Sequence, residues 1–386
     1  MKRCCAGPPR PRGVPAIRVL YLHHVTQLSG AENSLLLLLR HLDRGQVTPF
    51  FALPSAGPFS EALEREEIPV VQVPFGPLRN FMGVLKSVSR LLTLIREHRI
   101  DLLHANGPQT NVCAGIAGRL TGIPVVWHAR NLLYGRMWDV DRVLARLPTR
   151  IICNSDAIRE RFRGSPAWEK SVTIVNAVNT LEFHPGQSGE PFRREMGVPD
   201  GVTVVGIVGR IGLGKGHEVF VEAAIRVLTR GSAARFFVIG DTLFPEDAWR
   251  ADELRRLVKE AGCDGRIRFV GYRRDIPQIM RGLDVLVLAS EAEPCGRVLF
   301  EAMASGTAVV ATNTGGTPEI VRDGMEGILI PPRNPESLAN AIGVLIDDPT
   351  LREKLGRNGV ARVLQEFAVD RYVARTLEVY EQAVSR

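Results

Sequence analysis

The sequence alternates short apolar segments with amphipathic segments along most of its 386 residues. In the first half, the segments predicted to be strands are Ile17–Val25, Val47–Leu53, Val70–Val73, Asp101–His104, Pro124–His128, Arg150–Cys153 and Val172–Val175. Most of them are separated by predicted helices such as Ala31–Leu42, Phe81–His98 and Thr110–Leu120. Near-continuous apolar strands separated by helices are typical of a parallel sheet with helices on both faces.

The pattern is interrupted at His184–Asp200, a stretch rich in Pro and Gly, and then starts again. The second series of predicted strands comprises Val202–Gly209, Arg235–Gly240, Arg266–Val270, Asp284–Ala289, Ala308–Thr312 and Gly327–Ile330. A chain of this length is long enough for two domains. We therefore predict an α/β protein built from two Rossmann-like, doubly wound domains that face each other across a cleft.

The predicted division of the chain has four parts. Residues 1–13 form a disordered basic tail, residues 14–188 the first domain and residues 189–367 the second. Residues 368–386 form a last helix that no strand follows, and we expect this helix to pack back on the first domain. Because ligands of open α/β sheets bind at the carboxyl ends of the strands, the cleft between the domains is the predicted site.

The composition is that of a globular protein with an excess of basic residues. Hydrophobic residues make up 45% of the chain and charged residues 24%, which excludes a largely disordered protein. The net charge of +7 indicates an anionic partner. The six cysteines form no CxxC pair, and the first thirteen residues contain no apolar segment typical of a signal peptide. We therefore expect a cytoplasmic protein with reduced thiols and no zinc site.

A glycine-rich loop with two cations lies between a predicted strand and a helix. Residues Gly209 to Lys215 match the first seven positions of a P-loop, G-x-x-x-x-G-K, but Gly216 replaces the Ser or Thr that would ligate magnesium. A P-loop NTPase is therefore disfavoured. Arg210 and Lys215, beside the free amides of a helix N-terminus, suit a diphosphate that needs no bound metal. The alternative is a glycine-rich turn whose cations are solvated.

Two further glycine turns can place backbone amides against a ligand. Gly30 lies in Ser29-Gly30-Ala31-Glu32, between the first strand and a helix. Gly316 lies in Gly315-Gly316-Thr317-Pro318-Glu319, in which the proline occupies the first position of a helix. Ordinary turns without a ligand are the alternative for both segments.

Two glutamates follow a predicted strand of the second series. Pro294 and Gly296 keep Glu293 in a loop, whereas Glu301 lies in the predicted helix Val298–Ser305. A carboxylate only accepts hydrogen bonds, so either side chain can hold the vicinal hydroxyls of a ribose or a sugar. Eight helical residues span ~12 Å, which disfavours glycoside hydrolysis. Two solvated glutamates are the alternative.

Together these segments resemble the retaining glycosyltransferases of family 4, the group 1 glycosyltransferases. The resemblance covers nearly the whole chain beyond the tail. Arg210 with Lys215 is similar to the family's Gly-Arg…Lys-Gly element, and Glu293 with Glu301 matches its Glu-x7-Glu signature. The resemblance implies the glycosyltransferase B fold, which contains two Rossmann-like domains.

The resemblance also implies a role for each matching residue. Arg210 and Lys215 would bind the donor diphosphate, Glu293 would act in catalysis at the donor sugar, and Glu301 would hold the nucleotide ribose. Amides around three consecutive residues would meet the phosphates: Gly296, Arg297 and Val298. Arg297 replaces a residue that is usually aliphatic in the family.

His128 ends a predicted strand of the first domain, where the family often has a histidine near the donor sugar. There it can hydrogen-bond a donor hydroxyl or shuttle a proton near pH 7. A strand-end histidine satisfied by protein neighbours is the alternative. His23, His24 and His104 also lie at ends of predicted strands, as candidates for the acceptor side.

The expected activity is hexosyl transfer, with retention, from a nucleotide diphosphate sugar to a hydroxyl of a glycan, a lipid-linked glycan or a small molecule. No metal or other cofactor is expected. The alternatives are a noncatalytic relative that binds sugar nucleotides or lipids, and an epimerase or phosphorylase of the same architecture. No helix-turn-helix, zinc-finger or RNP pattern is present, so nucleic acid is not an expected partner.

Membrane binding is a further possibility, because the chain has two basic amphipathic segments, Phe81–Arg99 and Tyr134–Arg150. Helices of this kind can lie on an anionic bilayer, here on the inner face of the membrane. A helix that covers a sheet has the same apolar stripe, and this core-facing interpretation is favoured.

Overall fold

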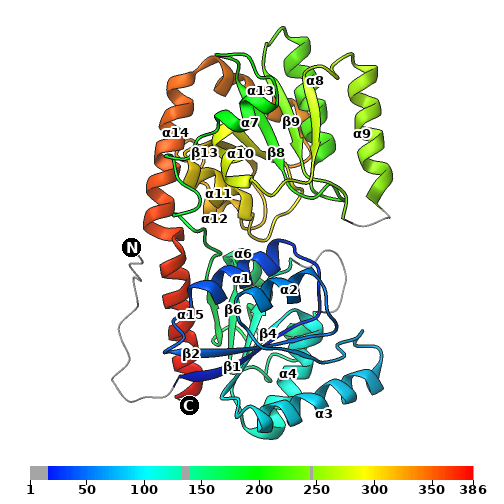
Figure 1. Ribbon diagram of the computed structural model, residues 1–386, viewed down its shortest axis with the longest axis vertical. Helices are drawn as coiled ribbons and strands as arrows, with labels where there is room; N and C mark the ends of the chain where they lie inside the picture. Colours follow the sequence, from blue (N-terminus) through cyan, green and yellow to red (C-terminus); the bar gives the residue numbers. More distant parts are fainter. Residues whose placement is uncertain (1–15, 133–138, 244–246, 386) are drawn as a thin grey trace. The chain divides into compact units, whose positions relative to one another are not determined.

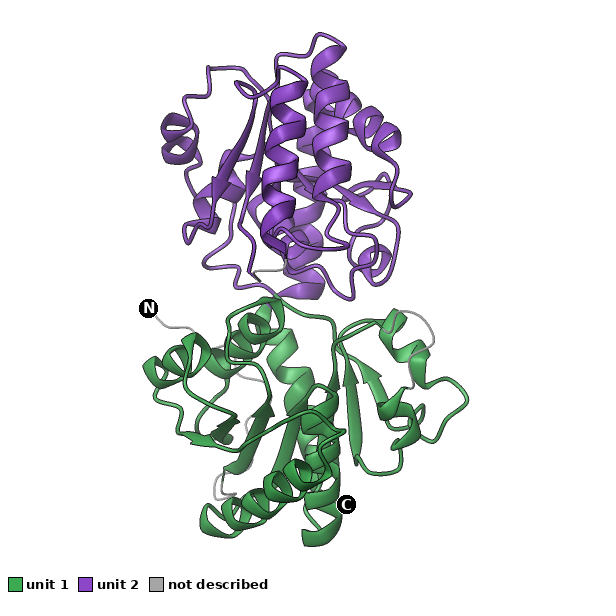
Figure 2. Cartoon of the chain, turned by 90° about the vertical axis from the view of Figure 1, so that its right-hand side faces the viewer, with its two compact units in different colours: residues 1–177, 369–386 green, residues 178–368 purple. Residues whose placement is uncertain are grey.

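The computed structural model describes residues 16–132, 139–243 and 247–385, so the predicted tail at 1–13 lies outside the described residues. The chain divides into two units, shown in Figure 2. Unit 1 comprises the described residues up to Ala177 together with those from Val369, and unit 2 is Val178–Ala368. Each unit is built on one parallel sheet, which confirms the prediction of two Rossmann-like α/β units.

Unit 1 contains a seven-stranded parallel sheet in the order β3-β2-β1-β4-β5-β6-β7. Its strands are β1 (Ile17–His23), β2 (Val47–Leu53), β3 (Val70–Gln72), β4 (Leu102–Asn106), β5 (Val125–Ala129), β6 (Arg150–Cys153) and β7 (Ser171–Thr173). Its α-helices are α1 (Gly30–His41), α2 (Pro58–Arg65), α3 (Phe81–Glu97), α4 (Pro108–Thr121), α5 (Val140–Val143), α6 (Asp156–Arg159) and α15 (Val369–Val384).

The helices of unit 1 cover both faces of its sheet because successive side chains of a strand point to opposite faces. Tyr21 and Val126 pack with residues of α1, α2 and α15. Their chain neighbours Leu20 and Trp127 pack with residues of α3 and α4. The helix α15, at the other end of the sequence, contacts α1, β4 and β5. Figure 1 shows this helix in red.

Unit 2 contains a six-stranded parallel sheet in the order β10-β9-β8-β11-β12-β13. Its strands are β8 (Val204–Val208), β9 (Arg235–Ile239), β10 (Ile267–Gly271), β11 (Val285–Leu288), β12 (Ala308–Thr312) and β13 (Gly327–Ile330). Its α-helices are α7 (Glu190–Glu195), α8 (His217–Thr229), α9 (Ala248–Glu260), α10 (Ile276–Gly282), α11 (Arg297–Ser305), α12 (Thr317–Ile320), α13 (Pro335–Asp347) and α14 (Pro349–Arg362).

Both sheets reverse their direction of growth at the centre. In unit 1 the neighbouring strands at this point are β1 and β4, and in unit 2 they are β8 and β11. Loops that leave such a pair of strands diverge to opposite sides and leave room for a ligand at the carboxyl ends. The loops after these four strands are therefore the first places to look for a site.

The boundary between the units differs from the prediction of residues 188 and 189, and lies between Ala177 and Val178. The segment that follows packs within unit 2, where the Phe183 side chain is buried. At Gly189, an added Cβ would lie 2.4 Å from backbone atoms of Arg281. The break in the strand–helix pattern therefore marks a packed segment of unit 2 that includes α7, and not a linker.

Two predicted helices also need correction. The segment Thr350–Phe367, which the sequence pattern also predicts to be a helix, ends as α-helix at Arg362 and continues as a π-helical turn, Val363–Phe367. Within Tyr134–Arg150, the described residues are α-helical at Val140–Val143 alone, and Arg150 already begins β6. Residues 133–138 lie outside the described part of the chain. None of the described helices is both long enough and apolar enough to span a membrane.

Candidate active site

The glycine-rich loop of unit 2 connects β8 to α8 and packs against the loop after β11. Gly216 has a φ of 73°, and a Cβ there would lie 1.9 Å from the carbonyl oxygen of Ala289. The Glu291 amide also donates a hydrogen bond of 2.9 Å to the carbonyl of Gly214. The departure from the P-loop at position 216 therefore has a structural reason, since only glycine fits this close approach.

Three of the predicted segments meet at Glu293. Lys215 Nζ donates to Glu293 Oε2 over 2.9 Å, and Ser290 Oγ donates to the same oxygen over 3.3 Å. The amide of Gly316 donates to the Glu293 carbonyl over 2.9 Å. The structure thus brings together the loop before α8, the loop after β11 and the turn before α12, although about 100 residues separate the first from the last.

Arg210, the second predicted cation, is held by a carboxylate that the sequence did not reveal. Its NH1 donates to Asp247 Oδ2 over 3.0 Å, and Arg250 Nε donates to Asp247 Oδ1 over 3.1 Å. An Asp directly before a helix is typical of an N-cap. The side chain of Asp247 makes no such hydrogen bond to α9, so it is not an N-cap of this kind despite its position.

Glu301 lies on α11, with 2% of its surface exposed. Its Oε1 is 2.8 Å from Arg297 NH1, one turn earlier on the same helix. Its Oε2 has no hydrogen-bond partner among the residues that the structure describes. Burial raises the pKa of Glu301, and the charge of Arg297 opposes that rise. Gly296 caps α11, so the amides of Arg297 and Val298 belong to the first turn, whose amides have no partner within the helix.

His217, which sequence reasoning missed, directly follows the glycine-rich loop. It is the first residue of α8, is 2% exposed, and neither ring nitrogen has a partner among the described residues. Burial and the charges of Lys215 and Arg210 lower its pKa to about 4, so the ring is neutral. Its position directly after Lys215-Gly216 is the sequence feature that could have identified it as a candidate site residue.

In unit 1, His23 at the end of β1 forms an ion pair with Glu32 of α1. His23 Nδ1 donates to the Asn106 carbonyl over 3.1 Å, and Nε2 lies 2.5 Å from Glu32 Oε1. Burial would raise the pKa of Glu32, but hydrogen bonds from His23 and Ser29 and the His23 charge lower it to about 2. The pair fixes the start of α1, where Gly30 has no atom within 4 Å of where its Cβ would be.

His128, near the end of β5, is engaged at one ring nitrogen. Its Nδ1 lies 3.2 Å from His104 Nε2 and 3.2 Å from Arg130 NH2, whereas its Nε2 has no partner among the described residues. His104 Nδ1 lies 2.5 Å from the Tyr380 hydroxyl. Both ring nitrogens of His104 have hydrogen-bond partners within the protein, and so do those of His23. These two histidines therefore have no ring nitrogen left to bind an acceptor substrate.

Several buried polar atoms without a recorded hydrogen bond belong to predicted site residues or to their neighbours in the chain. A buried donor or acceptor without a hydrogen bond costs about 1–3 kcal/mol, so each one needs a reason. In unit 2, such atoms among the described residues include Glu301 Oε2, Thr317 Oγ1 and both His217 ring nitrogens. In unit 1 they include His24 Nδ1 and His128 Nε2, at the ends of β1 and β5. A hydroxyl-rich or phosphate ligand would supply the missing partners.

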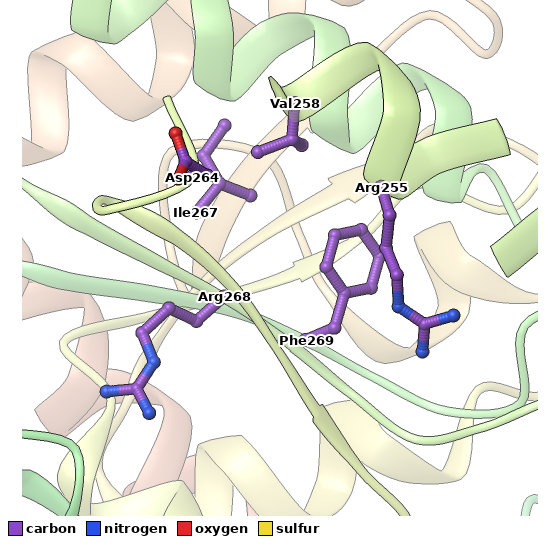
Figure 3. Close-up of a pocket in the computed structure, with 6 residues that line it drawn as sticks. All are labelled: Arg255, Val258, Asp264, Ile267, Arg268 and Phe269. Carbon is purple, nitrogen blue, oxygen red and sulfur yellow. The ribbon is translucent and has the colours of Figure 1, made fainter. Parts of the chain in front are cut away.

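A separate hollow of about 270 Å³ lies on unit 2 and contains none of these residues (Figure 3). Its lining comes from α9, β10 and the turn between them: Arg255, Val258, Asp264, Ile267, Arg268 and Phe269. The Arg268 guanidinium donates to the Met196 carbonyl, and that of Arg255 lies over the Phe269 ring. The hollow flanks the edge strand β10, away from the central strands, and we do not assign it to the site.

Comparisons with known proteins identify the family of the chain. The model of the Glycosyl transferases group 1 matches residues 189–362, and that of Glycosyltransferase Family 4 matches residues 28–181. The D-inositol 3-phosphate glycosyltransferase of Actinosynnema mirum is 30% identical over 351 residues, which are 85% of this chain and 81% of that protein.

Solved structures of HepE from Anabaena are similar over almost the entire chain. The complex with UDP has a TM-score of 0.85 and 28% identity, and the match covers 95% of this chain and 100% of HepE. The complex with UDP-glucose has a TM-score of 0.83 at the same identity, and the match covers 95% and 99% of the two chains.

The fold, the loops and these comparisons define an enzyme of the glycosyltransferase B fold, with two Rossmann-like domains. The chain belongs to the group 1 glycosyltransferases, and it is a glycosyltransferase. The resemblance that Arg210, Lys215, Glu293 and Glu301 indicated is thereby confirmed at the level of the family.

Proposed function

We propose that the protein transfers a sugar from a nucleotide diphosphate sugar to an acceptor hydroxyl, with retention of the anomeric configuration, and that unit 2 holds the donor. The observation that carries the proposal is the meeting of Lys215, Glu293 and the Gly316 turn beside the central strands of unit 2. HepE was crystallised with UDP and with UDP-glucose, which makes uridine nucleotides the first donors to test.

The cations of unit 2 are positioned before a ligand arrives. Lys215 is paired with Glu293 and Arg210 with Asp247, so each long side chain already has a fixed direction. In our proposal a diphosphate binds both cations. As the bond from the anomeric carbon to the diphosphate breaks, its electron pair leaves with the nucleoside diphosphate. The acceptor oxygen forms the new bond, and its proton passes to an oxygen of the departing diphosphate. Fixed cations stabilise the charge that grows on the leaving oxygens.

The remaining residues of unit 2 have complementary roles. Glu301 holds the ribose through Oε2, the oxygen that has no protein partner among the described residues. The amides of Arg297 and Val298 at the start of α11, together with Gly296, meet the phosphates. Glu293 orients the donor sugar and stabilises a positive charge at its anomeric carbon.

In unit 1 we assign His128 a hydrogen bond to a sugar hydroxyl rather than proton transfer near pH 7. Burial and the charge of Arg130 lower the pKa of His128 well below its usual value, so the ring stays neutral. A neutral imidazole with a free N–H is a hydrogen-bond donor. Gly30 leaves open space at the start of α1, which allows a ligand to approach the backbone.

The proposed reaction needs no divalent metal because Arg210, Lys215 and helix amides neutralise the diphosphate. Among the described residues, no three His, Cys, Asp or Glu side chains are grouped as metal ligands. The corresponding experiment is transfer in the presence of EDTA, which we expect to proceed at the rate seen with added Mg²⁺. A rate restored by Mg²⁺ after EDTA treatment would contradict this part of the proposal.

We further propose a cytoplasmic protein that binds the anionic inner face of a membrane through the start of α3. The helix buries Val88, Leu91 and Leu94 in the core of unit 1, which agrees with the core-facing interpretation. Its first turns, however, expose Phe81 and Met82, with 68% and 62% of their surfaces accessible. Exposed basic residues surround them: Arg79, Lys86 and Arg90. Apolar side chains flanked by cations suit an anionic bilayer.

The experiment that tests the proposed function is product analysis with a panel of nucleotide sugars. The purified protein is incubated with each donor and with glycan, lipid-linked and small-molecule acceptors. We expect nucleoside diphosphate release that depends on the acceptor, and a glycoside whose anomeric configuration matches the donor. An inverted product would contradict retention.

Parallel reactions distinguish the alternatives. An epimerase changes the donor sugar without an acceptor, and a phosphorylase yields sugar phosphate when orthophosphate is added. A noncatalytic relative binds the donor and turns over nothing with any acceptor. Each of these results would replace the proposed transfer.

A further inference from the structure

A chain of hydrogen bonds runs from the C-terminal helix to His128. Tyr380, on α15, has its hydroxyl 3.0 Å from the hydroxyl of Tyr21 and 2.5 Å from His104 Nδ1. His104 Nε2 in turn lies 3.2 Å from His128 Nδ1. All four side chains have no exposed surface. The chain joins β1, α15, β4 and β5, within unit 1.

The partners fix where the protons lie. Arg130 donates to His128 Nδ1 over 3.2 Å, and a guanidinium cannot accept, so Nδ1 carries a lone pair. His104 Nε2 faces the same lone pair and therefore carries a proton. His104 is a neutral ring, so its Nδ1 is an acceptor, which the Tyr380 hydroxyl satisfies as donor. The Tyr380 hydroxyl also lies 3.0 Å from the Tyr21 hydroxyl.

Because each group in this series of hydrogen bonds donates to the next, the last one, His128, has a donor without a partner in the described part of the chain. With Nδ1 of His128 an acceptor, the ring proton is on Nε2, and this N–H has no partner among the described residues. Three groups from distant parts of the sequence thus donate in one direction, from Tyr380 through His104 to His128. Within this series of hydrogen bonds, the Nε2–H of His128 is the group that remains for a ligand.

We propose that Tyr380 and His104 are positioning residues that, together with Arg130, hold His128 as the Nε2–H tautomer, ready to donate to a hydroxyl of the sugar substrate. The use of this N–H in transfer rests on the proposed function, whereas the tautomer itself does not. The last helix of the chain would then set the protonation of a group on β5, in addition to covering the sheet.

The chain offers a matched pair of variants on one helix. Tyr380→Phe removes the hydroxyl that donates to His104 and keeps the ring in the core. Tyr372→Phe removes a hydroxyl from another buried tyrosine of α15, which has no hydrogen-bond partner among the described residues. The second variant therefore controls for loss of a buried hydroxyl without an effect on the chain of hydrogen bonds.

The direct readout is ¹⁵N NMR of histidine-labelled protein, which distinguishes protonated from unprotonated ring nitrogens. The protein has eight histidines, and His104→Gln and His128→Gln assign the two signals by their loss. We expect His104 and His128 in the wild type to be protonated at Nε2 alone. In Tyr380→Phe, part of the His104 population should shift to the Nδ1–H form, whereas Tyr372→Phe should leave both histidines unchanged.

A second readout compares two replacements of His104 in the transfer reaction. Glutamine offers an acceptor and a donor on neighbouring atoms, whereas methionine offers only volume. We expect His104→Met and Tyr380→Phe to lower kcat about tenfold, the effect of one neutral hydrogen bond. His104→Gln should retain more of the activity, and Tyr372→Phe all of it.

Each outcome decides the proposal. His128 protonated at Nδ1 in the wild type would overturn it, as would unchanged tautomers in Tyr380→Phe. A rate loss in Tyr380→Phe without a tautomer shift would assign Tyr380 a structural role only and would also overturn it. If the tautomers behave as expected but no donor is turned over, the positioning by Tyr380 and His104 stands and the proposed transfer fails.

Discussion

The two units share one architecture but differ in the polar groups at the carboxyl ends of their central strands. In unit 2 these groups form ion pairs: Lys215–Glu293, Arg210–Asp247 and Arg297–Glu301. In unit 1 the corresponding region contains the His23–Glu32 pair and, beside it, neutral rings joined by hydrogen bonds, in which His104, His128 and Tyr380 take part. The same sheet order therefore supports two different kinds of chemistry.

Exposure distinguishes the two regions further. The side chains of Lys215, Arg210 and Arg297 are 33–37% exposed, whereas the side chains of His104 and His128 have no exposed surface. Accessible cations held by carboxylates suit an anionic ligand that replaces one ionic partner with another. A buried neutral donor suits a hydroxyl. The difference agrees with a diphosphate in unit 2 and sugar hydroxyls at unit 1.

The largest expected effect comes from removing both diphosphate cations. Arg210→Ala with Lys215→Ala should abolish transfer, with a loss of about a thousandfold or more in kcat/KM, because two charge-assisted hydrogen bonds to the leaving group disappear. The measurement is nucleoside diphosphate release under saturating acceptor. Circular dichroism checks that the fold is intact.

A matched control removes the same charge from a surface helix. Arg256→Ala with Lys259→Ala changes two cations of α9, where Arg256 pairs with exposed glutamates. We expect turnover close to that of the wild type. Equal losses in the two double variants would show that net charge, and not the site in unit 2, controls the rate.

A smaller effect is expected at the ribose. Glu301→Gln keeps the shape of the side chain but weakens its acceptors, so nucleoside diphosphate affinity should fall about ten- to thirtyfold. The 2′-deoxynucleotide provides the sharper measurement. The wild type should discriminate against it, and Glu301→Gln should lose most of that discrimination. If both proteins discriminate equally against the 2′-deoxynucleotide, Glu301 does not bind the ribose.

Buried neutral histidines occur in both units, and they predict how stability depends on pH. Burial lowers the pKa of His104 to about 3 and that of His217 to about 4, whereas the unfolded rings titrate near 6.5. Below pH 6.5 the unfolded state binds protons that the folded state does not. The free energy of unfolding should therefore fall by about 1.4 kcal/mol per pH unit for each histidine.

Urea unfolding between pH 6.5 and pH 5 measures this slope. His104→Gln should reduce the pH dependence of the free energy of unfolding by the contribution of one histidine in unit 1. His217→Gln should do the same in unit 2. A stability that rises as the pH falls through this window would contradict the neutral burial of both rings.

The smallest effect is expected at the start of α3, where unit 1 presents apolar side chains among cations. Phe81→Ser with Met82→Ser should reduce flotation with vesicles of phosphatidylglycerol and phosphatidylcholine at low salt, and leave turnover of a soluble acceptor unchanged. Leu181→Ser with Tyr272→Ser, two exposed side chains of unit 2, is the control. A wild-type protein that fails to float would end the membrane proposal.

The sequence predicted the local order of the fold well, because each strand and each glycine loop depends on neighbouring residues. All thirteen strands of the two series are present, with ends that differ by two residues at most. The unit boundary was wrong because a Pro- and Gly-rich segment such as that around Gly189 can pack as tightly as a helix. Composition does not distinguish these cases.

The partners in the site were less predictable because they come from remote segments. Ser29 and Glu32 form a capping box at the start of α1, and the contact of Glu32 with His23 depends on the packing of α1 over β1. Tyr380 is 276 residues from His104, and Asp247 has the position of an ordinary N-cap. Such pairs follow from tertiary structure and not from spacing.

The most direct test of the central claim is the affinity of unit 2 for phosphate groups, measured by calorimetry with a nucleoside, its monophosphate and its diphosphate. For the wild type, we predict that affinity rises about a hundredfold or more from nucleoside to diphosphate. In Arg210→Ala with Lys215→Ala this rise should disappear, while the weak affinity for the nucleoside stays the same. A double variant that keeps the full rise would contradict the assignment of the donor diphosphate to these two cations.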